Sequence, residues 1–518
     1  MYRWTTIALL TVLPVAGLSA QNQATPAQTT GPLSLSLEEA LSIAKANSPL
    51  YAQSLSTADP AKWGVRAAYG GLLPAVGVSG GMGYTGSGST NLGGGAIIPT
   101  SPQIGSNYNL GITYNLNGQT IFAPGQNKAT KRATEQEIAG TETNLVADVT
   151  TQYLTVKQAD AQVAVQIQQV DRNKIFLDLA NAKMKVGQGT LLEVKQAEVS
   201  LGQAQVELLR RQQTSSEAKL ELFRRMGISA PSALNLLTLT DSFPVVEFNP
   251  GVDTILDLAA KQNPDLQALR EHQRSAQFAL KAAKSEYFPT LFAQAGWSGY
   301  TQQFTDESLL ISQQLSGAQG TAANCNFQNG VINGLTYGPG GIPGQPNGGL
   351  IADCNAFAGL NPGGTALDPA VQQSLIDNNR TFPFHFTSQP FQASLTISLP
   401  IFNGFSRELR VSQARQQVKD LDERVRARAQ LLETDVRGRY LRIQTAYEAI
   451  PVQWSNVLAA REQLKLAQDR YRLGSGNALE IADAQNGVQA AEGDYINAIF
   501  AYHQAIVALE AAVGHSLR

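Results

Sequence analysis

The sequence has few of the residues from which catalytic and metal sites are built. Its 518 residues include only two cysteines, Cys325 and Cys354, and four histidines. Charged residues make up 15% of the chain, against roughly 25% in an ordinary soluble domain. The net charge is −2, which argues against binding nucleic acid or anionic lipid through excess positive charge. We therefore predict no catalytic site, no metal site, no cofactor and no nucleic-acid partner.

Long hydrophobic runs are also scarce, and the clearest one lies at the N-terminus. Residues 1–20 combine a basic start at Arg3, an apolar stretch and the small residues Ser19 and Ala20, the pattern of a secretory signal peptide. No cysteine follows the expected cleavage site, so we expect no lipid anchor. Since no later run reaches the ~18 apolar residues of a membrane-spanning helix, any part of the mature chain that enters a membrane must consist of β-strands.

The mature chain contains two copies of one pattern. Three positions recur after 215 residues, and a glycine-containing motif recurs after 287. These are Leu41, Pro49 and Pro74 with Leu256, Pro264 and Pro289, and Gly187-x-Gly189-x-x-Leu192-Glu193 with Gly474-x-Gly476-x-x-Leu479-Glu480. We predict a first structural repeat at 21–226, a linker at 227–250 at the equator of the molecule, and a second repeat at 251–518 with an insertion at 301–390. Two copies indicate a duplicated fold rather than a solenoid.

Each copy is expected to contain a very long helix. Apolar residues occupy every seventh position from Val149 to Met184, and again from Val436 to Tyr471. Heptads sustained over this length are typical of coiled-coil packing. The first helix should have roughly 60 residues, or ~90 Å at 1.5 Å per residue. Pro451 interrupts the second helix and is expected to kink it or to need a compensating contact.

Alternating sequence predicts four strands, at residues 76–84, 108–116, 291–297 and 391–399. Apolar residues alternate there with glycine, serine, asparagine, threonine or glutamine, as in an outer-membrane strand with one face to lipid and the other to a polar lumen. A half-buried sheet in a soluble protein is the alternative. The connections at 85–107 and 301–390 are expected to be long loops, and the second should be extracellular. Because a secreted chain would oxidise its thiols, we predict a disulfide between Cys325 and Cys354 in that loop.

Four strands cannot close a barrel, since natural membrane barrels need at least ~8 and a bilayer does not tolerate an open sheet edge. The barrel must therefore be shared among subunits. Dimer, trimer and tetramer all remain open on these grounds. The expected fold is α+β, a duplicated helix–strand–strand–helix–helix unit with four barrel strands per chain.

Several motifs resemble the TolC-like outer-membrane efflux protein family over essentially the whole mature chain. They are Leu35-x-Leu37-Glu38-Glu39-Ala40-Leu41, Asn47-x-Pro49, Leu72-Leu73-Pro74, Leu399-Pro400-Ile401-Phe402-Asn403-Gly404, and the turns Val186-Gly187 and Leu473-Gly474. The resemblance implies a homotrimer with a 12-stranded outer-membrane β-barrel and a periplasmic α-barrel tunnel of coiled-coil helices. It implies docking onto an inner-membrane transporter through a periplasmic adaptor (membrane fusion) protein, and no enzymatic activity.

The function expected from this resemblance is a passive exit duct for small molecules such as drugs and toxic compounds. The channel of a type I protein secretion system, or of metal-ion efflux, remains an alternative within the family. From a different class, the chain could be a secreted periplasmic coiled-coil adaptor or scaffold whose sheet is soluble.

The resemblance places two helical turns at the periplasmic end of the tunnel, where they would contact the adaptor. The candidate contact residues are Gly187, Gln188, Gly189, Gly474, Ser475 and Gly476. Bare glycines let another backbone approach closely, although a helix end favours glycine in any case. Both explanations remain open.

Acidic residues beyond these turns are candidates for a periplasmic gate that also sets ion selectivity. Glu193 and Glu480 fit capping boxes or close relatives, whereas Asp483 has Gln196 as its repeat partner, so the repeat does not require an acid there. By resemblance, Glu480 and Asp483 would line the tunnel mouth, and Tyr471 and Glu193 would bond between neighbouring subunits. The family's basic residue beyond the second turn is here Gly476, a departure from that pattern.

Overall fold

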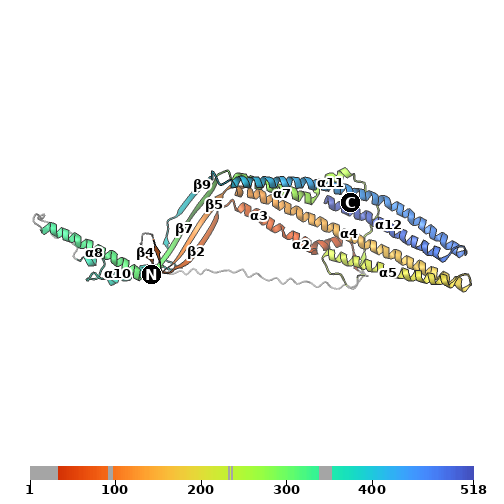
Figure 1. Ribbon diagram of the computed structural model, residues 1–518, viewed down its shortest axis with the longest axis horizontal. Coiled ribbons are helices and arrows are strands. Elements are labelled where there is room, and N and C mark those ends of the chain that lie inside the picture. The colour runs from red at the N-terminus through yellow and green to blue at the C-terminus, as the bar shows by residue number, and fades with distance from the viewer. Residues whose placement is uncertain (1–32, 92–96, 232–233, 235–236, 338–352, 518) are drawn as a thin grey trace, which may run out of the picture. The chain divides into compact units, whose positions relative to one another are not determined.

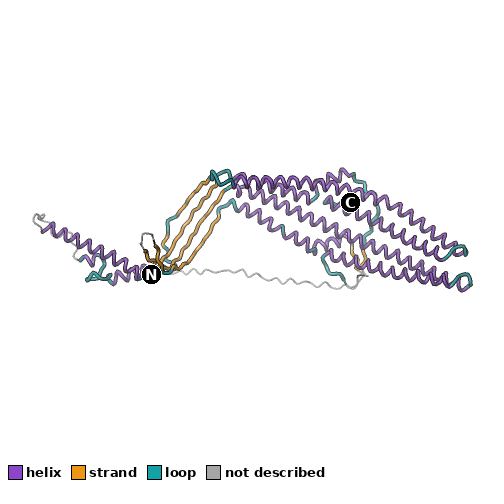
Figure 2. The backbone as a smooth tube through the Cα atoms, viewed as in Figure 1, coloured by secondary structure: helices purple, strands orange, loops and turns teal. Residues whose placement is uncertain are grey.

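The computed structural model describes residues 33–91, 97–231, 234, 237–337 and 353–517, so the signal peptide expected at 1–20 lies outside the described residues. The chain divides into two compact units. The first comprises Met1–Ala58, Ala133–Arg270 and Arg424–Arg518, and the second comprises Asp59–Arg132 and Glu271–Glu423. Where described, the first unit is mostly helical and the second contains the main sheet (Figures 1 and 2).

The elements follow the predicted order in both repeats. The first repeat contains α1 (Leu37–Asn47), α2 (Pro49–Ser56), α3 (Ala58–Gly70), β2 (Ala75–Thr85), the hairpin β3 (Gly88–Asn91) and β4 (Ile97–Thr100), β5 (Gln103–Leu116), α4 (Gly118–Lys185) and α5 (Leu191–Met226). The second contains α6 (Val252–Gln262), α7 (Pro264–Ser285), β7 (Thr290–Phe304), β9 (Gln392–Ser398), α11 (Ser406–Arg472) and α12 (Ala478–Val513). This confirms an α+β fold with long helices and antiparallel strands.

The repeat-equivalent helices have almost the same lengths. α1 and α6 have 11 residues each, α5 and α12 have 36 each, and α4 and α11 have 68 and 67. α4 is therefore longer than the roughly 60 residues that the sequence predicts. Pro451 lies inside α11, and Pro124 lies inside α4. Both helices continue past their proline.

The predicted heptad positions of α11, from Val436 to Tyr471, are all buried, whereas in α4 only Val149 and Val156 are. Val149 and Val156 of α4 are buried in a cluster with Ala44 of α1 and Leu222 of α5. The repeat-equivalent residues Val436, Ile443, Ala259 and Leu509 form the corresponding cluster of α11, α6 and α12. By composition, α12 is the one described helix apolar enough to cross a membrane, a feature that the search for unbroken apolar runs missed. Its residues Ile506 and Leu509 are instead buried in this second core.

A small parallel sheet that the sequence did not predict joins the segment before α1 to the segment between α5 and α6. It pairs β1 (Leu33–Leu35) with β6 (Leu237–Leu239). Beside this sheet lies the buried Tyr153 of α4. Its hydroxyl group is within donating distance of two acceptors, Leu35 O at 2.9 Å and Asp241 Oδ2 at 2.7 Å. Burial would raise the pKa of Asp241, but the hydrogen bonds from Tyr153 and from the Leu37 backbone outweigh it, so the net pKa is lowered.

The four predicted strands form one antiparallel sheet in the order β2–β5–β7–β9 (Figure 1). The pairs Val78–Leu110, Leu110–Trp297 and Ala293–Leu395 lie directly opposite each other. Since side chains alternate between the two faces, this register brings the apolar positions of all four strands to one face. The other face carries glycine, serine, asparagine, threonine and glutamine, with a few aromatics.

The insertion between β7 and β9 is largely helical, whereas we expected a loop. It contains α8 (Ser308–Tyr337), α9 (Cys354–Phe357), α10 (Pro369–Asn379) and the short strand β8 (Thr387–Ser388). α8 forms because apolar residues recur every three or four positions, and Ala318 and Ala322 are buried against Leu360 and Leu367. Cys325 and Cys354 form a disulfide with their Cα atoms 5.7 Å apart. Likewise, the connection 85–107 contains the β3–β4 hairpin.

Candidate functional site at the two helical turns

The two predicted turns have the same backbone. Gly187 and Gly474 adopt positive φ angles of 77° and 80°, and an added Cβ would meet no atom within 4 Å at either position. Gln188 N donates to Lys183 O over 2.9 Å, and Ser475 N donates to Arg470 O over the same distance. These bonds complete the helix C-terminus, and the left-handed backbone explains the glycine at each first position. Both glycines are open to a binding partner.

The second glycine of each turn has a different role. A Cβ at Gly189 would lie 3.1 Å from Lys183 Cβ, and one at Gly476 would lie 3.0 Å from Tyr471 N. Close packing of the turn against its own helix therefore accounts for both. All four glycines among the six candidate contact residues thus have a structural reason, but only Gly187 and Gly474 also leave open space beside them.

The acids that follow the turns are held differently. Glu193 completes a capping box with Thr190: Glu193 N donates to Thr190 Oγ1 over 3.3 Å, and Thr190 N donates to Glu193 Oε2 over 3.2 Å. In the second turn, Asn477 Oδ1 accepts from Glu480 N over 2.9 Å, while the Glu480 carboxylate lies 3.4 Å from Arg470. The carboxylate of Glu480 is thus not needed for the cap and forms an ion pair instead.

Tyr471 links the two turns. Its hydroxyl lies 3.5 Å from Glu193 Oε2, its backbone carbonyl accepts from Lys183 Nζ, and Phe176 packs edge-on against its ring. Burial, helped by the charge of Glu193, raises its pKa. The contact between Tyr471 and Glu193 therefore occurs within one chain.

Asp483 is exposed and has no hydrogen-bond or ion-pair partner in the described part of the chain. It lies one helical turn beyond Glu480 on α12. Neither a cap nor a salt bridge accounts for its charge. Of the four gate candidates, it is the one whose charge is fully available to an ion in solution.

A groove beside the turns lies between α5 and α12. It has a volume of about 340 Å³ and is lined by Phe176, Leu192, Lys195, Gln196, Val199, Ser200, Ala478, Leu479 and Ala482. Along α5, Leu192, Val199 and Val206 recur every seventh residue, and each is more than half exposed. An exposed heptad stripe is suited to packing against another helix.

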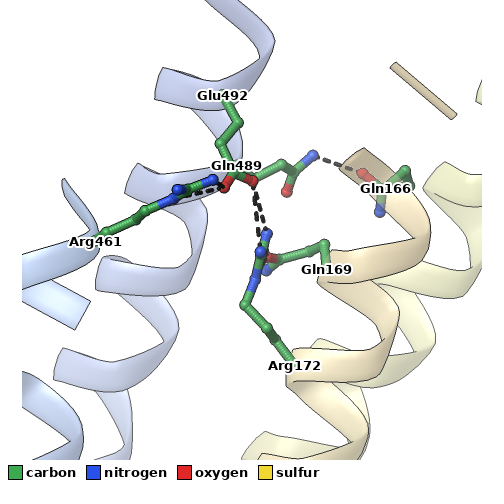
Figure 3. A network of polar contacts seen from close by, with 6 residues as sticks. All are labelled: Gln166, Gln169, Arg172, Arg461, Gln489 and Glu492. Atoms are coloured by element: carbon green, nitrogen blue, oxygen red, sulfur yellow. Dashed lines mark hydrogen bonds and ion pairs between the residues drawn. The ribbon is translucent and has the colours of Figure 1, made fainter. Parts of the chain in front are cut away.

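Sequence reasoning missed a polar network that joins three helices of the first unit (Figure 3). The side chain of Glu492 on α12 is 7% exposed, and its carboxylate lies 3.4 Å from Arg172 of α4 and 2.7 Å from Arg461 of α11. Gln169 accepts two hydrogen bonds from Arg172, and Gln489 donates to Gln166 over 2.7 Å. Burial lowers the pKa of Arg172, partly offset by the charge of Glu492. The partners are too far apart in sequence for spacing to reveal them.

The described residues at the two turns offer exposed surfaces and charges. No group of three or more histidine, cysteine or acidic residues in the described residues could hold a metal ion. A sheet with one apolar and one polar face, combined with helices of 67 and 68 residues, is the construction of an outer-membrane channel protein.

Comparison with known proteins gives the family. The sequence profile of the outer membrane efflux protein family matches residues 40–227 and 366–515, so the chain belongs to this family. The protein is therefore an outer-membrane efflux channel that extends into the periplasm, as predicted. The family is not one of enzymes, which confirms the prediction that the chain is not an enzyme.

A curated relative is the fusaric acid resistance protein FusA of Burkholderia cepacia, 26% identical over 395 residues. The match covers 74% of this chain and 66% of the relative. Among solved structures, the channel CusC has 15% identity and a TM-score of 0.66, with 92% of each chain covered. The outer membrane protein VceC of Vibrio cholerae has 14% identity and a TM-score of 0.65, covering 93% of this chain and 97% of its own. These structures support the fold.

Proposed function

We propose that the chain is the exit duct of a tripartite export system that carries small molecules across the outer membrane. The sheet is the observation that supports this most strongly. Its apolar positions share one face, and among the described strands its edges β2 and β9 each pair with one neighbour only. Because a bilayer does not tolerate unpaired edges, further copies of the chain would complete the barrel.

The proposed assembly is a homotrimer. Three copies give 12 strands, the number implied by the resemblance to TolC-like channels. The outer face would meet lipid, and the polar face would line the lumen. In this assembly, α4, α5, α11 and α12 of each subunit form the wall of a periplasmic tunnel.

The proposed partners are a periplasmic adaptor and an inner-membrane transporter, which supplies the energy. The open glycines Gly187 and Gly474 and the apolar groove between α5 and α12 suit contact with an α-helical hairpin. The relative named for fusaric acid resistance favours small toxic compounds as cargo over secreted proteins.

Fractionation of cells that express the chain tests the proposal. We expect it in the outer membrane as a heat-labile trimer that resists SDS at room temperature. Recovery from the soluble periplasm, without such a band, would favour a coiled-coil adaptor or scaffold. Export is then tested by growth on toxic organic acids after deletion of the gene.

The adaptor-contact proposal needs variants that keep the turns folded. Asparagine tolerates positive φ, so Gly187→Asn and Gly474→Asn add a side chain at small backbone cost. We expect each to weaken co-purification of the adaptor at least several-fold, while Gly438→Ala, on an open surface of α11, leaves it unchanged. Wild-type capture by both turn variants would mean that these glycines serve the turns alone.

The disulfide between Cys325 and Cys354 is proposed to lie outside the cell. A membrane-impermeant thiol reagent should label intact cells only after a reductant is added. Labelling without reductant, or none with it, would contradict this placement.

A further inference from the structure

A short segment crosses the apolar face of the sheet. Residues 381–386 connect α10 to β8 and pass over β7 towards β5. Thr381 Oγ1 donates to Gln302 O over 2.9 Å, and Phe382 N donates to the side chain of Gln303 over 3.2 Å. Pro383 O accepts from Ser106 Oγ over 2.5 Å. We call residues 381–386 the strap.

The register shows which face the strap covers. Ser106 and Tyr108 lie on the same face of β5 as Leu110 and Ile112, because side chains two residues apart point the same way. The ring of Phe386 packs edge-on against Tyr108, with centroids 4.9 Å apart. The strap therefore lies on the apolar face, which in the proposed trimer is the outward face of the barrel.

The apolar face becomes polar where the strap crosses it. Beyond Tyr108 and Trp297, the outward positions include Ser106 on β5 and Thr301 on β7, which lie opposite each other. Both are 4% exposed, and Ser106 N donates to Thr301 Oγ1 over 2.9 Å. Unsatisfied hydroxyls are costly in lipid. The strap supplies a carbonyl acceptor to Ser106 and separates both hydroxyls from their surroundings.

The outer side of the strap is apolar. Phe384 is 72% exposed, and residues 381–386 contain no lysine, arginine, aspartate or glutamate; the exposed His385 is their one ionisable side chain. Trp297 and Phe391 lie on the same face of the sheet, with ring centroids 4.8 Å apart, and both are about half exposed. Phe384, Trp297 and Phe391 are thus exposed aromatic side chains near the place where the apolar face ends. They resemble the aromatic girdle that marks the membrane surface of outer-membrane barrels.

We propose that the strap is a membrane-interface anchor, which closes the outward face where it turns polar and places Phe384 in the lipid of the outer leaflet. Lipid is the occupant because the strap continues the apolar face of the sheet and, apart from the imidazole of His385, carries no side chain that could form an ion pair with a polar partner. The inference rests on the proposed barrel, since the face meets lipid only there. Next to the strap, Asn379 at the end of α10 exchanges two hydrogen bonds with the backbone of Phe304, and these attach the insertion to β7.

Photocrosslinking in outer membranes tests the anchor. Benzoylphenylalanine is placed at 384, at 78 on the outward face of β2, at 394 on the polar face of β9, and at 357, an exposed phenylalanine of α9. After illumination, the purified chain is analysed by mass spectrometry for lipopolysaccharide or phospholipid adducts. We expect adducts at 384 and 78, and at least ten-fold less at 394 and 357.

The four positions separate the anchor from the barrel on which it rests. Adducts at 78 without adducts at 384 would overturn the anchor and leave the barrel intact. Crosslinks from 384 to another protein chain would overturn lipid as the occupant. If neither 78 nor 384 reacts with lipid, the barrel itself is wrong, and the anchor falls with it.

Discussion

At three equivalent positions, the first repeat has polar and charged side chains, whereas the second has aromatic and aliphatic ones. In the first repeat, Asp160, Ser215 and Lys219 form an ionic cluster, in which Lys219 Nζ lies 3.1 Å from Asp160 and Ser215 donates to the same carboxylate oxygen over 2.5 Å. In the second, the same positions hold Tyr447, Tyr502 and Ile506, with the two tyrosine rings 5.5 Å apart. The same arrangement of long helices can therefore pack around either an ionic cluster or an aromatic cluster.

The difference shows which interactions the helices require. An ion pair removed from water repays its desolvation only with good geometry, and a packed apolar cluster can replace it without loss of stability. The duplicated fold is therefore specified by its heptad pattern, whereas the polar contacts distinguish one repeat from the other.

The largest effect is expected from the aromatic cluster. Tyr502 is 1% exposed, and its hydroxyl donates to Val246 O. Tyr502→Ala removes the ring from a core that cannot collapse around it, at a cost of about 3–5 kcal/mol. The equivalent change Ser215→Ala should cost only about 1 kcal/mol. Denaturant unfolding in detergent measures both, and equal losses would mean that the two clusters carry equal weight.

Breaking the ionic cluster on one side comes next. Asp160→Ala leaves the ammonium of Lys219, whose side chain is 10% exposed, without its counter-charge, at a cost of about 3 kcal/mol. Replacing all three residues by their counterparts, Asp160→Tyr, Ser215→Tyr and Lys219→Ile, should cost less than Asp160→Ala alone. If the triple variant is less stable than Asp160→Ala, the aromatic cluster of the second repeat cannot replace the ionic cluster of the first.

A second asymmetry between the repeats involves Glu492, whose counterpart is Gln205. Glu492→Gln copies the first repeat but leaves Arg172 and Arg461 facing each other without a carboxylate. We expect a loss of about 2 kcal/mol, less than for a fully buried charge because the side chain of Arg461 is half exposed. Glu433→Gln, which breaks an exposed pair with Arg437, is the matched control and should change stability little. A Glu492→Gln variant as stable as this control would show that the network is not needed to hold the three helices together.

Much of this plan could be predicted from the sequence, because it rests on periodic patterns. The heptads from Val149 and Val436 gave both long helices, and alternation gave all four strands. The helical insertion was missed, since glycine and asparagine in α8 outweighed the spacing of Ile311, Leu315 and Ala318. The strap and the network around Glu492 follow no period. Their partners are up to 323 residues apart in sequence, so only the folded chain brings them together.

The smallest effect on stability, and the most specific one on transport, is expected from the two turns. Their backbones match, but the first holds Glu193 in a capping box and has Gln196 where the second has the free acid Asp483. In the proposed trimer, Glu480 and Asp483 would line the periplasmic mouth, and the field of such a ring favours entry of cations. Since Arg470 already pairs with Glu480, Asp483 should contribute the larger share.

Planar-bilayer recordings can separate these roles. Asp483→Asn should reduce cation selectivity and block by a trivalent cation added on the periplasmic side, while the unfolding midpoint stays within about 0.5 kcal/mol of the parent, as for other exposed sites. Glu480→Gln should have the weaker effect on conduction, because its charge is already partly neutralised. Glu193→Gln, which keeps a side-chain oxygen for the cap, serves as the control from the first repeat and should conduct like the parent. If the Asp483→Asn, Glu480→Gln double variant selects and is blocked like the parent, these acids are ordinary helix-end residues and the turns differ in sequence only.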